Sequence, residues 1–294
     1  MMKDKGKLKP MIIDFHTHTF PDQIASAAVD KLMRASHTLP FSNGTAGGLI
    51  QSRIRAGIDR CVVLPVATSS RQVIHINDAA IRMNEVSGQT GLYSLGAMHP
   101  DFEDWHGELG RLAAAGIRGI KLHPPYQQTD IDDPRCLRIL THAAELGLFV
   151  IIHAGLDVGL PGDQSAMPEK IARALLQTGP VPFVCAHMGG WRCWEEAAEL
   201  LAPLGVMIDT AFSLGAMTSS VDGYPWKEEE LRMLDDTAFL RLVRCFGPER
   251  VLFGTDSPWA DQKTELEHLR SLPLAQDELS AILGGNAQRL MGWI

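Results

Sequence analysis

The sequence has few of the features that mark secreted, membrane-bound or nucleotide-binding proteins. Its five cysteines are odd in number and include no C-x-x-C pair, so neither a disulfide framework nor a zinc knuckle is indicated. No stretch approaches the ~18 uninterrupted apolar residues of a membrane span, and MMKDKGKLKP leads into no signal-peptide hydrophobic region. No G-x-G-x-x-G or G-x-x-x-x-G-K-[ST] motif follows a candidate strand, so NAD and ATP are not expected. These absences favour a cytoplasmic protein with reduced thiols.

An excess of positive charge is also absent. The chain carries 27 Lys and Arg against 35 Asp and Glu, a formal net charge of −8, which disfavours nucleic acid and anionic membranes as partners. The remaining composition, 45% hydrophobic and 6% aromatic over 294 residues, is that of a globular chain. This length fits one barrel-type domain of ~250 residues or two smaller domains. The strand pattern therefore has to decide the domain count.

Short apolar runs rich in Val, Ile and Leu recur eight times and are the candidate strands. They span residues 11–15, 61–66, 92–98, 117–122, 148–152, 181–186, 205–209 and 250–254. Helical spacing is found between them, for example over residues 104–115, 134–146, 169–177, 194–204 and 234–246. Apolar strands that alternate with helices are typical of parallel pairing through right-handed crossovers, and eight such units predict a (β/α)₈ TIM barrel. A doubly wound open sheet is the alternative.

Nothing in the sequence divides the chain into separate units. No long linker, low-complexity tract or repeat is found, so we predict a single domain over residues 1–294. Three connections, 21–57, 154–168 and 210–235, are longer than ordinary loops. In a barrel such loops gather over the end where active sites form, so residues 210–234 are expected to form a lid. A surface insertion is the alternative for this segment.

Histidine or aspartate stands at the end of the first, fifth, sixth and eighth candidate strands, among others. The residues are His16, His18, His153, His187 and Asp256. Alternate residues of a strand share a face, so His16 and His18 can act together as imidazole ligands. An H-x-H pair alone arises easily by chance among eleven histidines, but its recurrence with other His and Asp at strand ends does not. A buried cluster of this kind without a cation would leave several polar groups without partners, so the pattern predicts a site for a zinc-like divalent ion.

These motifs resemble the amidohydrolase superfamily, in particular the branch that includes aminocarboxymuconate-semialdehyde decarboxylase and γ-resorcylate decarboxylase. The resemblance is carried by the segments IIDFHTHTFP, GIKLHP, VIIHAG, RVLFGTDSPW and ILGGNAQRLMGW. It implies that His16, His18, His153 and Asp256 bind one divalent metal, Zn²⁺ with Mn²⁺ as the alternative, and that the protein is a homodimer. It also implies that His187 is an acid/base residue. The chemistry agrees, because Asp256 can both bind the metal and accept a proton from its water, and an imidazole can orient or protonate the substrate.

Lys121 and His123 stand two residues apart at the end of the fourth candidate strand, so both are expected to face the barrel mouth. In other branches of the superfamily a lysine at this strand is carboxylated and bridges two metals, which makes a binuclear site the alternative to contact with a substrate carboxylate. His123 precedes two prolines, and a purely structural role at the strand end is its alternative.

Aromatic residues and one arginine follow the candidate catalytic strands. Tyr126, Trp191, Arg192 and Trp194 are expected to form an aromatic wall with a guanidinium for an anionic group. Trp259 is expected to close the pocket floor or to pack under a helix.

Three functions are compatible with these residues. The first is a metal-dependent hydrolase that uses a metal-activated water on an amide, ester or lactone carbonyl of a small anionic substrate. The second is a non-oxidative decarboxylase of an aromatic or unsaturated carboxylic acid, which Lys121 and Arg192 leave open. The third is a non-catalytic barrel that binds a metabolite or a metal. Substrate specificity depends on loop side chains, so the sequence does not name the substrate.

Overall fold

The computed structural model describes residues 11–179, 181–220 and 222–294. Within them the strands form two sheets, in the orders β1-β2-β3 and β4-β5-β6-β7-β8-β9, and every pairing is parallel. The strands are β1 (Ile13–Thr17), β2 (Arg60–Val63), β3 (Leu92–Ser94), β4 (Gly96–Ala97), β5 (Gly119–Leu122), β6 (Phe149–Ile152), β7 (Phe183–Cys185), β8 (Met207–Asp209) and β9 (Val251–Leu252).

The two sheets close into one barrel. The Phe15 N–H donates to the carbonyl of Phe253 over 2.7 Å, which joins β1 to the end of β9. At the other junction β3 and β4 are halves of one strand on either side of Leu95, whose N–H donates to the carbonyl of Val63 over 3.0 Å. A closed ring of parallel strands with helices between them is the predicted (β/α)₈ barrel, and the prediction is confirmed against the open-sheet alternative.

The third candidate strand is not continuous, contrary to the prediction for residues 92–98. Asn84 bonds the backbone N–H and carbonyl of Ser94 (2.7 and 3.0 Å), and Asn77 does the same at Ala97 (2.8 and 3.0 Å). Each half therefore pairs with only one neighbouring strand, β3 with β2 and β4 with β5. Carboxamide side chains occupy backbone groups that a second strand would otherwise bond.

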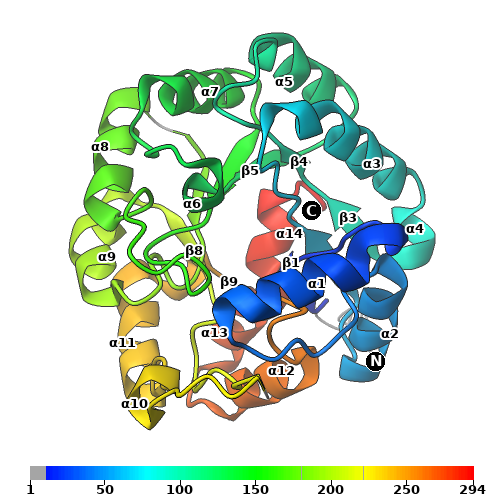
Figure 1. Ribbon diagram of the computed structural model, residues 1–294. Coiled ribbons are helices and arrows are strands. Elements are labelled where there is room, and N and C mark those ends of the chain that lie inside the picture. Colours follow the sequence, from blue (N-terminus) through cyan, green and yellow to red (C-terminus); the bar gives the residue numbers. More distant parts are fainter. Residues whose placement is uncertain (1–10, 180, 221) are drawn as a thin grey trace, which may run out of the picture.

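Most helices surround the barrel, whereas α1 crosses over its strands in Figure 1. The helices are α1 (Asp22–Ser36), α2 (Ala46–Ala56), α3 (Val73–Glu85), α4 (Ser87–Thr90), α5 (Trp105–Ala114), α6 (Pro124–Gln127), α7 (Pro134–Glu145), α8 (Pro168–Thr178), α9 (Trp194–Leu200), α10 (Glu228–Leu231), α11 (Asp236–Phe246), α12 (Gln262–Ser271), α13 (Gln276–Ser280) and α14 (Asn286–Leu290). Short 3₁₀ segments are η1 (Ser70–Gln72), η2 (Ala202–Leu204) and η3 (Pro248–Arg250), and η4 (Ala281–Gly285) is a π-helical turn. None of the helices in the described ranges has the length and apolar content that a bilayer span requires.

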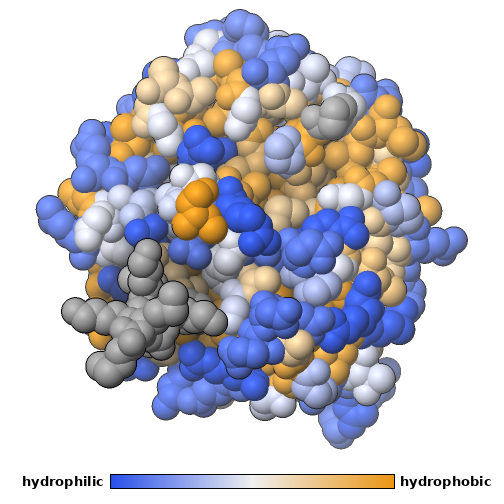
Figure 2. All heavy atoms as spheres, turned by 180° about the vertical axis from the view of Figure 1, so that it is seen from behind, coloured by the Kyte–Doolittle hydropathy of each residue, from blue (hydrophilic) through white to orange (hydrophobic). Residues whose placement is uncertain are grey.

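The inside of the barrel is filled by apolar side chains from the strands. Phe15, Val62, Ile151 and Val184 belong to this inner core, together with Met291 from the chain end. Helix α14, drawn behind the strands in Figure 1, thus closes the barrel on the side away from α1. Figure 2 shows that opposite side, where hydrophilic and hydrophobic residues are interspersed on the surface. The functional groups therefore have to be sought at the other end, where the strands finish.

Candidate active site

A cavity of about 690 Å³ lies at the carboxyl ends of the strands. The residues that the sequence singled out line it, with the exception of Arg192 and Trp194: His16, His18, Lys121, His123, Tyr126, His153, His187, Trp191, Asp256 and Trp259. The active sites of TIM barrels lie at this end. The structure thus brings the candidate residues to one place, and their roles stay predictions.

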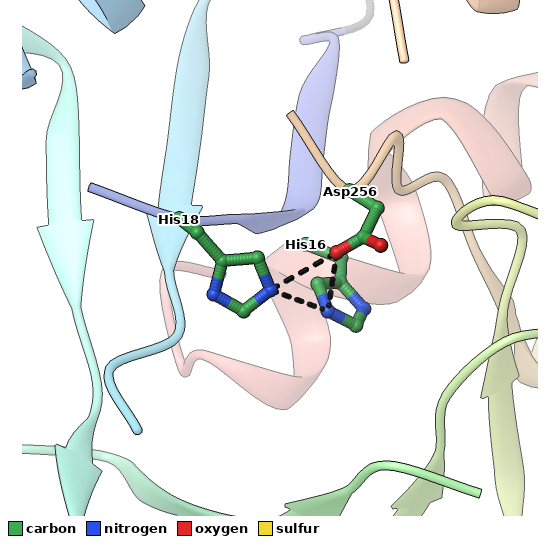
Figure 3. A group of neighbouring side chains, drawn as sticks. All are labelled: His16, His18 and Asp256. Carbon is green, nitrogen blue, oxygen red and sulfur yellow. Dashed lines mark hydrogen bonds and ion pairs between the residues drawn. The ribbon is translucent and has the colours of Figure 1, made fainter. Parts of the chain in front are cut away.

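His16, His18 and Asp256 converge on one point (Figure 3). The Nε2 atoms of the two imidazoles are 3.1 Å apart. Asp256 Oδ1 lies 3.3 Å from Nε2 of His16 and 3.0 Å from Nε2 of His18. His16 belongs to strand β1, and His18 is the residue directly after that strand. Asp256 follows β9 and has a backbone φ of 66°. The first and last strands of the barrel therefore form this group together.

The protons on these two imidazoles are fixed by their outer neighbours. Nδ1 of His16 lies 2.7 Å from a carboxylate oxygen of Asp209, and Nδ1 of His18 lies 2.8 Å from the carbonyl of Leu64. Both partners are acceptors, so each neutral ring carries its proton on Nδ1 and presents a lone pair at Nε2. Two lone pairs and the Asp256 carboxylate then face one another without a proton between them. This donor set fits a divalent cation of the zinc type.

His153, predicted as a fourth ligand, contacts His187, and its role as a ligand stays a prediction. Its Nδ1 is 3.1 Å from Nε2 of His187, and its Nε2 is 3.0 Å from the carbonyl of Leu156. His187 in turn places its Nδ1 3.0 Å from the carbonyl of Ala211. Two neutral imidazoles carry two N–H protons, whereas three hydrogen bonds at these three contacts would need three. This pair of histidines therefore also requires an added proton or a cation. His153 is thereby linked to His187 rather than to His16 and His18.

His123 and Asp157 lie beside His153. The rings of His123 and His153 stack with centroids 4.4 Å apart, and Nε2 of each is 3.7 Å from Asp157 Oδ2. Nδ1 of His123 accepts the N–H of Tyr126 and caps α6, so its proton lies on Nε2 and faces the carboxylate. A proton at Nε2 suits a hydrogen bond better than metal ligation. The capping bond is a structural role for His123 at the strand end, which is the alternative left open by the sequence.

Asp209 is a site residue that the sequence reasoning missed. Besides the His16 imidazole it accepts the backbone N–H groups of His187 (2.8 Å) and Ala211 (3.1 Å). The side chain is fully buried and ends β8. Its position in the sequence could have identified it, because the seventh candidate strand, 205–209, also ends on an acidic residue. One carboxylate therefore orients both a candidate ligand and the candidate acid/base residue.

Burial shifts the pKa values of the buried site residues. It lowers the pKa of Lys121 to about 8, although Asp209, Asp256 and Asp157 act in the opposite direction. It lowers the pKa of His187 and raises the pKa of Asp209 to about 6. For Asp256 burial alone would raise the pKa, but the imidazoles beside it outweigh burial and hold the pKa below its usual range. Asp256 is thus kept as a carboxylate.

Arg192 does not line the cavity, contrary to the expectation of a guanidinium there for a substrate anion. Its guanidinium donates to the backbone carbonyls of Glu230 and Arg232 and lies 4.9 Å from the Trp191 ring centroid. Trp194 is turned away in a similar manner, because its indole N–H donates to the carbonyl of His187 over 3.0 Å. Both side chains bond loop carbonyls instead of facing the cavity.

Helix α1, in the first long connection, covers the cavity. Its residues Ile24, Ala28 and Leu32 line the cavity, whereas Phe212 is the lining residue from the described part of segment 210–234. Position 221 of the predicted lid lies outside the described residues. The segment instead borders the end of α1, where Thr38 pairs with Ser219. Its role as a lid stays a prediction.

Comparisons with known proteins agree with this architecture. A family model described as amidohydrolase matches residues 13–293. An uncharacterised TIM-barrel protein from Bordetella bronchiseptica is 19% identical, with a TM-score of 0.74 and coverage of 96% of this chain and 98% of that one. The 5-carboxyvanillate decarboxylase from Sphingomonas paucimobilis is 16% identical, with a TM-score of 0.67 and coverage of 97% and 99%.

A third solved structure is described as a hydrolase. The putative 2-pyrone-4,6-dicarboxylic acid hydrolase from Pseudomonas putida is 19% identical, with a TM-score of 0.64 and coverage of 97% of this chain and 99% of that one. No curated protein matches the sequence. At these identities the solved structures show a shared fold.

Proposed function

Because the chain belongs to the amidohydrolase family, we propose that it is a metal-dependent hydrolase acting on an amide, ester or lactone carbonyl of a small anionic substrate. The observation that carries this proposal is the meeting of His16 Nε2, His18 Nε2 and Asp256 Oδ1 without a proton between them. It supports a divalent cation, proposed as Zn²⁺ with Mn²⁺ as the alternative. When bound, such a cation supplies Lewis-acid polarisation of a substrate oxygen. The cytoplasmic location and the homodimer stay predictions.

The residues around this group have complementary proton-transfer roles. Asp256, held as a carboxylate by its imidazole neighbours, can accept the proton of the attacking water. His187 is anchored through Nδ1 to the carbonyl of Ala211, and its Nε2, which faces Nδ1 of His153, can take up a proton and pass it to the leaving group. The apolar wall of the cavity, which includes Trp191 and Trp259, holds the substrate and limits bulk water.

Decarboxylation of an aromatic or unsaturated acid is the second candidate, favoured by Lys121. This side chain is 1% exposed and lines the same cavity. A buried ammonium in an apolar, partly aromatic pocket can hold a substrate carboxylate away from water. In this reaction a proton has to reach the carbon that loses CO₂, and a protonated His187 can deliver it.

One labelling experiment tests both reactions. The metal-loaded protein is incubated with aromatic and unsaturated acids that also carry an ester or lactone, in H₂¹⁸O and separately in D₂O. Hydrolysis places one ¹⁸O in the product carboxylate, whereas decarboxylation releases CO₂ and places one deuterium on carbon. H187N should lower turnover about 10²-fold or more while keeping its metal. The partly exposed His268 pairs with Asp236 on the surface, so H268N is the matched control.

The outcomes separate the three hypotheses. ¹⁸O in the product supports the hydrolase, and deuterium on carbon with CO₂ release supports the decarboxylase. Binding of the acids without turnover, unchanged by H187N, would support the non-catalytic barrel and contradict the enzyme.

A further inference from the structure

Two cations line the outer part of the cavity. Lys31 on α1 and Arg71 on η1 are cavity residues that are exposed to solvent, whereas His16 and Lys121 at the strand ends are each 1% exposed. Within residues 11–179, 181–220 and 222–294 neither cation takes part in an ion pair. We name Lys31 and Arg71 the cationic rim.

The carboxylates of the cavity lie beside its histidines, Asp256 next to His16 and His18 and Asp157 next to His123 and His153. Asp157 and Asp256 are the acidic residues among its described lining, and both are 8% exposed. Among the described residues, the ion pairs of both acids are with these histidines, and neither is with the cationic rim. In a chain of net charge −8, two unpaired cations at one opening attract anions locally against the overall field.

The turn that carries Arg71 is held in place by its own side chains. The Gln72 carboxamide oxygen accepts the backbone N–H of Thr68 (2.8 Å), the Thr68 hydroxyl (3.1 Å) and the N–H of Ser69 (3.2 Å). These bonds fix the backbone just before η1. A guanidinium on a pre-organised turn loses less conformational freedom when it binds a ligand than one on a loose loop.

Apolar side chains share the cavity with the rim. Phe20, Ile24, Leu32, Val66 and Ile76 line the cavity along with the rim residues. A ligand that fills this space has an apolar body, with its reacting group near His16, His18 and Asp256. Its other end then lies near Lys31 and Arg71.

We propose that the cationic rim binds a second anionic group of the substrate, a carboxylate or a phosphate, at the end remote from the reacting group. The substrate class is accordingly a dianion with an apolar spacer. This inference rests on the proposed function for the reacting end, and the rim itself is a specificity site that takes no part in the chemistry.

Calorimetric titration of the metal-loaded protein tests this with matched probes. Benzoate is compared with terephthalate and 4-phosphonobenzoate, and cinnamate with 4-carboxycinnamate and 4-phosphonocinnamate. In at least one series the second anionic group should tighten binding about 10-fold, and the gain should shrink as salt rises. The member that gains shows whether the rim prefers carboxylate or phosphate.

Charge-neutral variants locate the effect. R71Q and K31Q should each reduce the gain to about 3-fold or less, with the single-anion probe bound as before. Arg82 on α3 and Arg34 on α1 are exposed and are not cavity residues, so R82Q and R34Q should keep the full gain. Metal content confirms that each variant is folded.

Three results would overturn the rim. The first is equal affinity for the probes with one and with two anionic groups in both series. The second is a gain in affinity that persists in the double variant R71Q/K31Q. The third is that the metal-loaded protein binds none of the probes. Failure of the proposed function is distinct, because it gives no labelled product while the charge-dependent gain in binding persists.

Discussion

Asp209 is the residue on which the orientation of the site depends. Its two oxygens bond Nδ1 of His16 and the backbone N–H of His187. A carboxylate behind a ligating imidazole fixes the tautomer and increases the basicity of the ligand. D209N removes this charge and places an amide N–H against at least one of the three N–H donors that Asp209 now accepts. We expect metal affinity to fall about 10- to 100-fold, measured by competition with a chromogenic chelator.

The control for that variant is an aspartate that also faces a histidine but lies on the surface. Asp236 Oδ1 is 2.8 Å from Nε2 of His268, and both side chains are exposed or partly exposed. D236N makes the same chemical change and should leave metal affinity unchanged. If D209N bound metal as tightly as D236N does, Asp209 would have no part in orienting the ligand.

At the scale of elements, helix α12 carries a partly buried acid, Glu265, with a clear pH signature. Burial, with smaller contributions from Asp14 and Asp261, raises the pKa of Glu265 to about 8. The folded state therefore binds this proton more tightly than the unfolded state, and its contribution to stability is lost as pH rises from about 4.5 through 8. E265Q should match wild type near pH 5 and exceed its free energy of unfolding by a few kcal/mol near pH 9.

Denaturant unfolding at both pH values measures this difference. Glu267 is an exposed residue of the same helix, so E267Q is the control and should follow wild type at each pH. A stability difference between E265Q and wild type that is the same at pH 5 and pH 9 would count against the proton on Glu265.

Helix α1 covers the cavity, and its end is fastened by residues far away in the sequence. The carbonyl of His37 accepts the N–H of Ser220 (2.9 Å) and the indole N–H of Trp226 (3.1 Å). W226F removes one of these donors and keeps most of the ring. Loss of one hydrogen bond should speed amide exchange at the end of α1 about 2- to 10-fold, read by mass spectrometry. W105F, on α5, should leave α1 unchanged, and an unchanged α1 in W226F as well would contradict this fastening.

For the whole molecule, the sequence pattern predicts the barrel because alternation of apolar strands and helices is a local property. The grouping of His16, His18 and Asp256 follows from that topology, since the ends of parallel strands meet at one face. The direction in which each imidazole nitrogen points does not follow from the topology. Asp209 stands 193 residues from His16, and the carbonyls that take the Arg192 guanidinium lie 38 and 40 residues along the chain. Such contacts depend on loop paths, which periodicity does not encode.

The candidate cation would join the first and last strands of the barrel, so its removal should affect the stability of the whole fold. His16 and His18 come from the β1 end, and Asp256 follows β9. A cation at about 100 times its dissociation constant adds about 2.7 kcal/mol, which for a chain of this size corresponds to a rise in Tm of about 4–5 °C. Scanning calorimetry before chelation, after chelation and after reloading with Zn²⁺ or Mn²⁺ measures it, with metal content by plasma mass spectrometry.

His18→Asn should abolish both the bound metal and its effect on Tm, because the variant lacks one of the two facing lone pairs. About one equivalent per chain supports the site of His16, His18 and Asp256. About two equivalents, reduced to one in K121M, would favour a carboxylated Lys121 that bridges a second cation. The metal-dependent mechanism would be contradicted if the wild-type protein took up no metal and its Tm did not change on reloading. Three acceptors would then face one another without a cation between them.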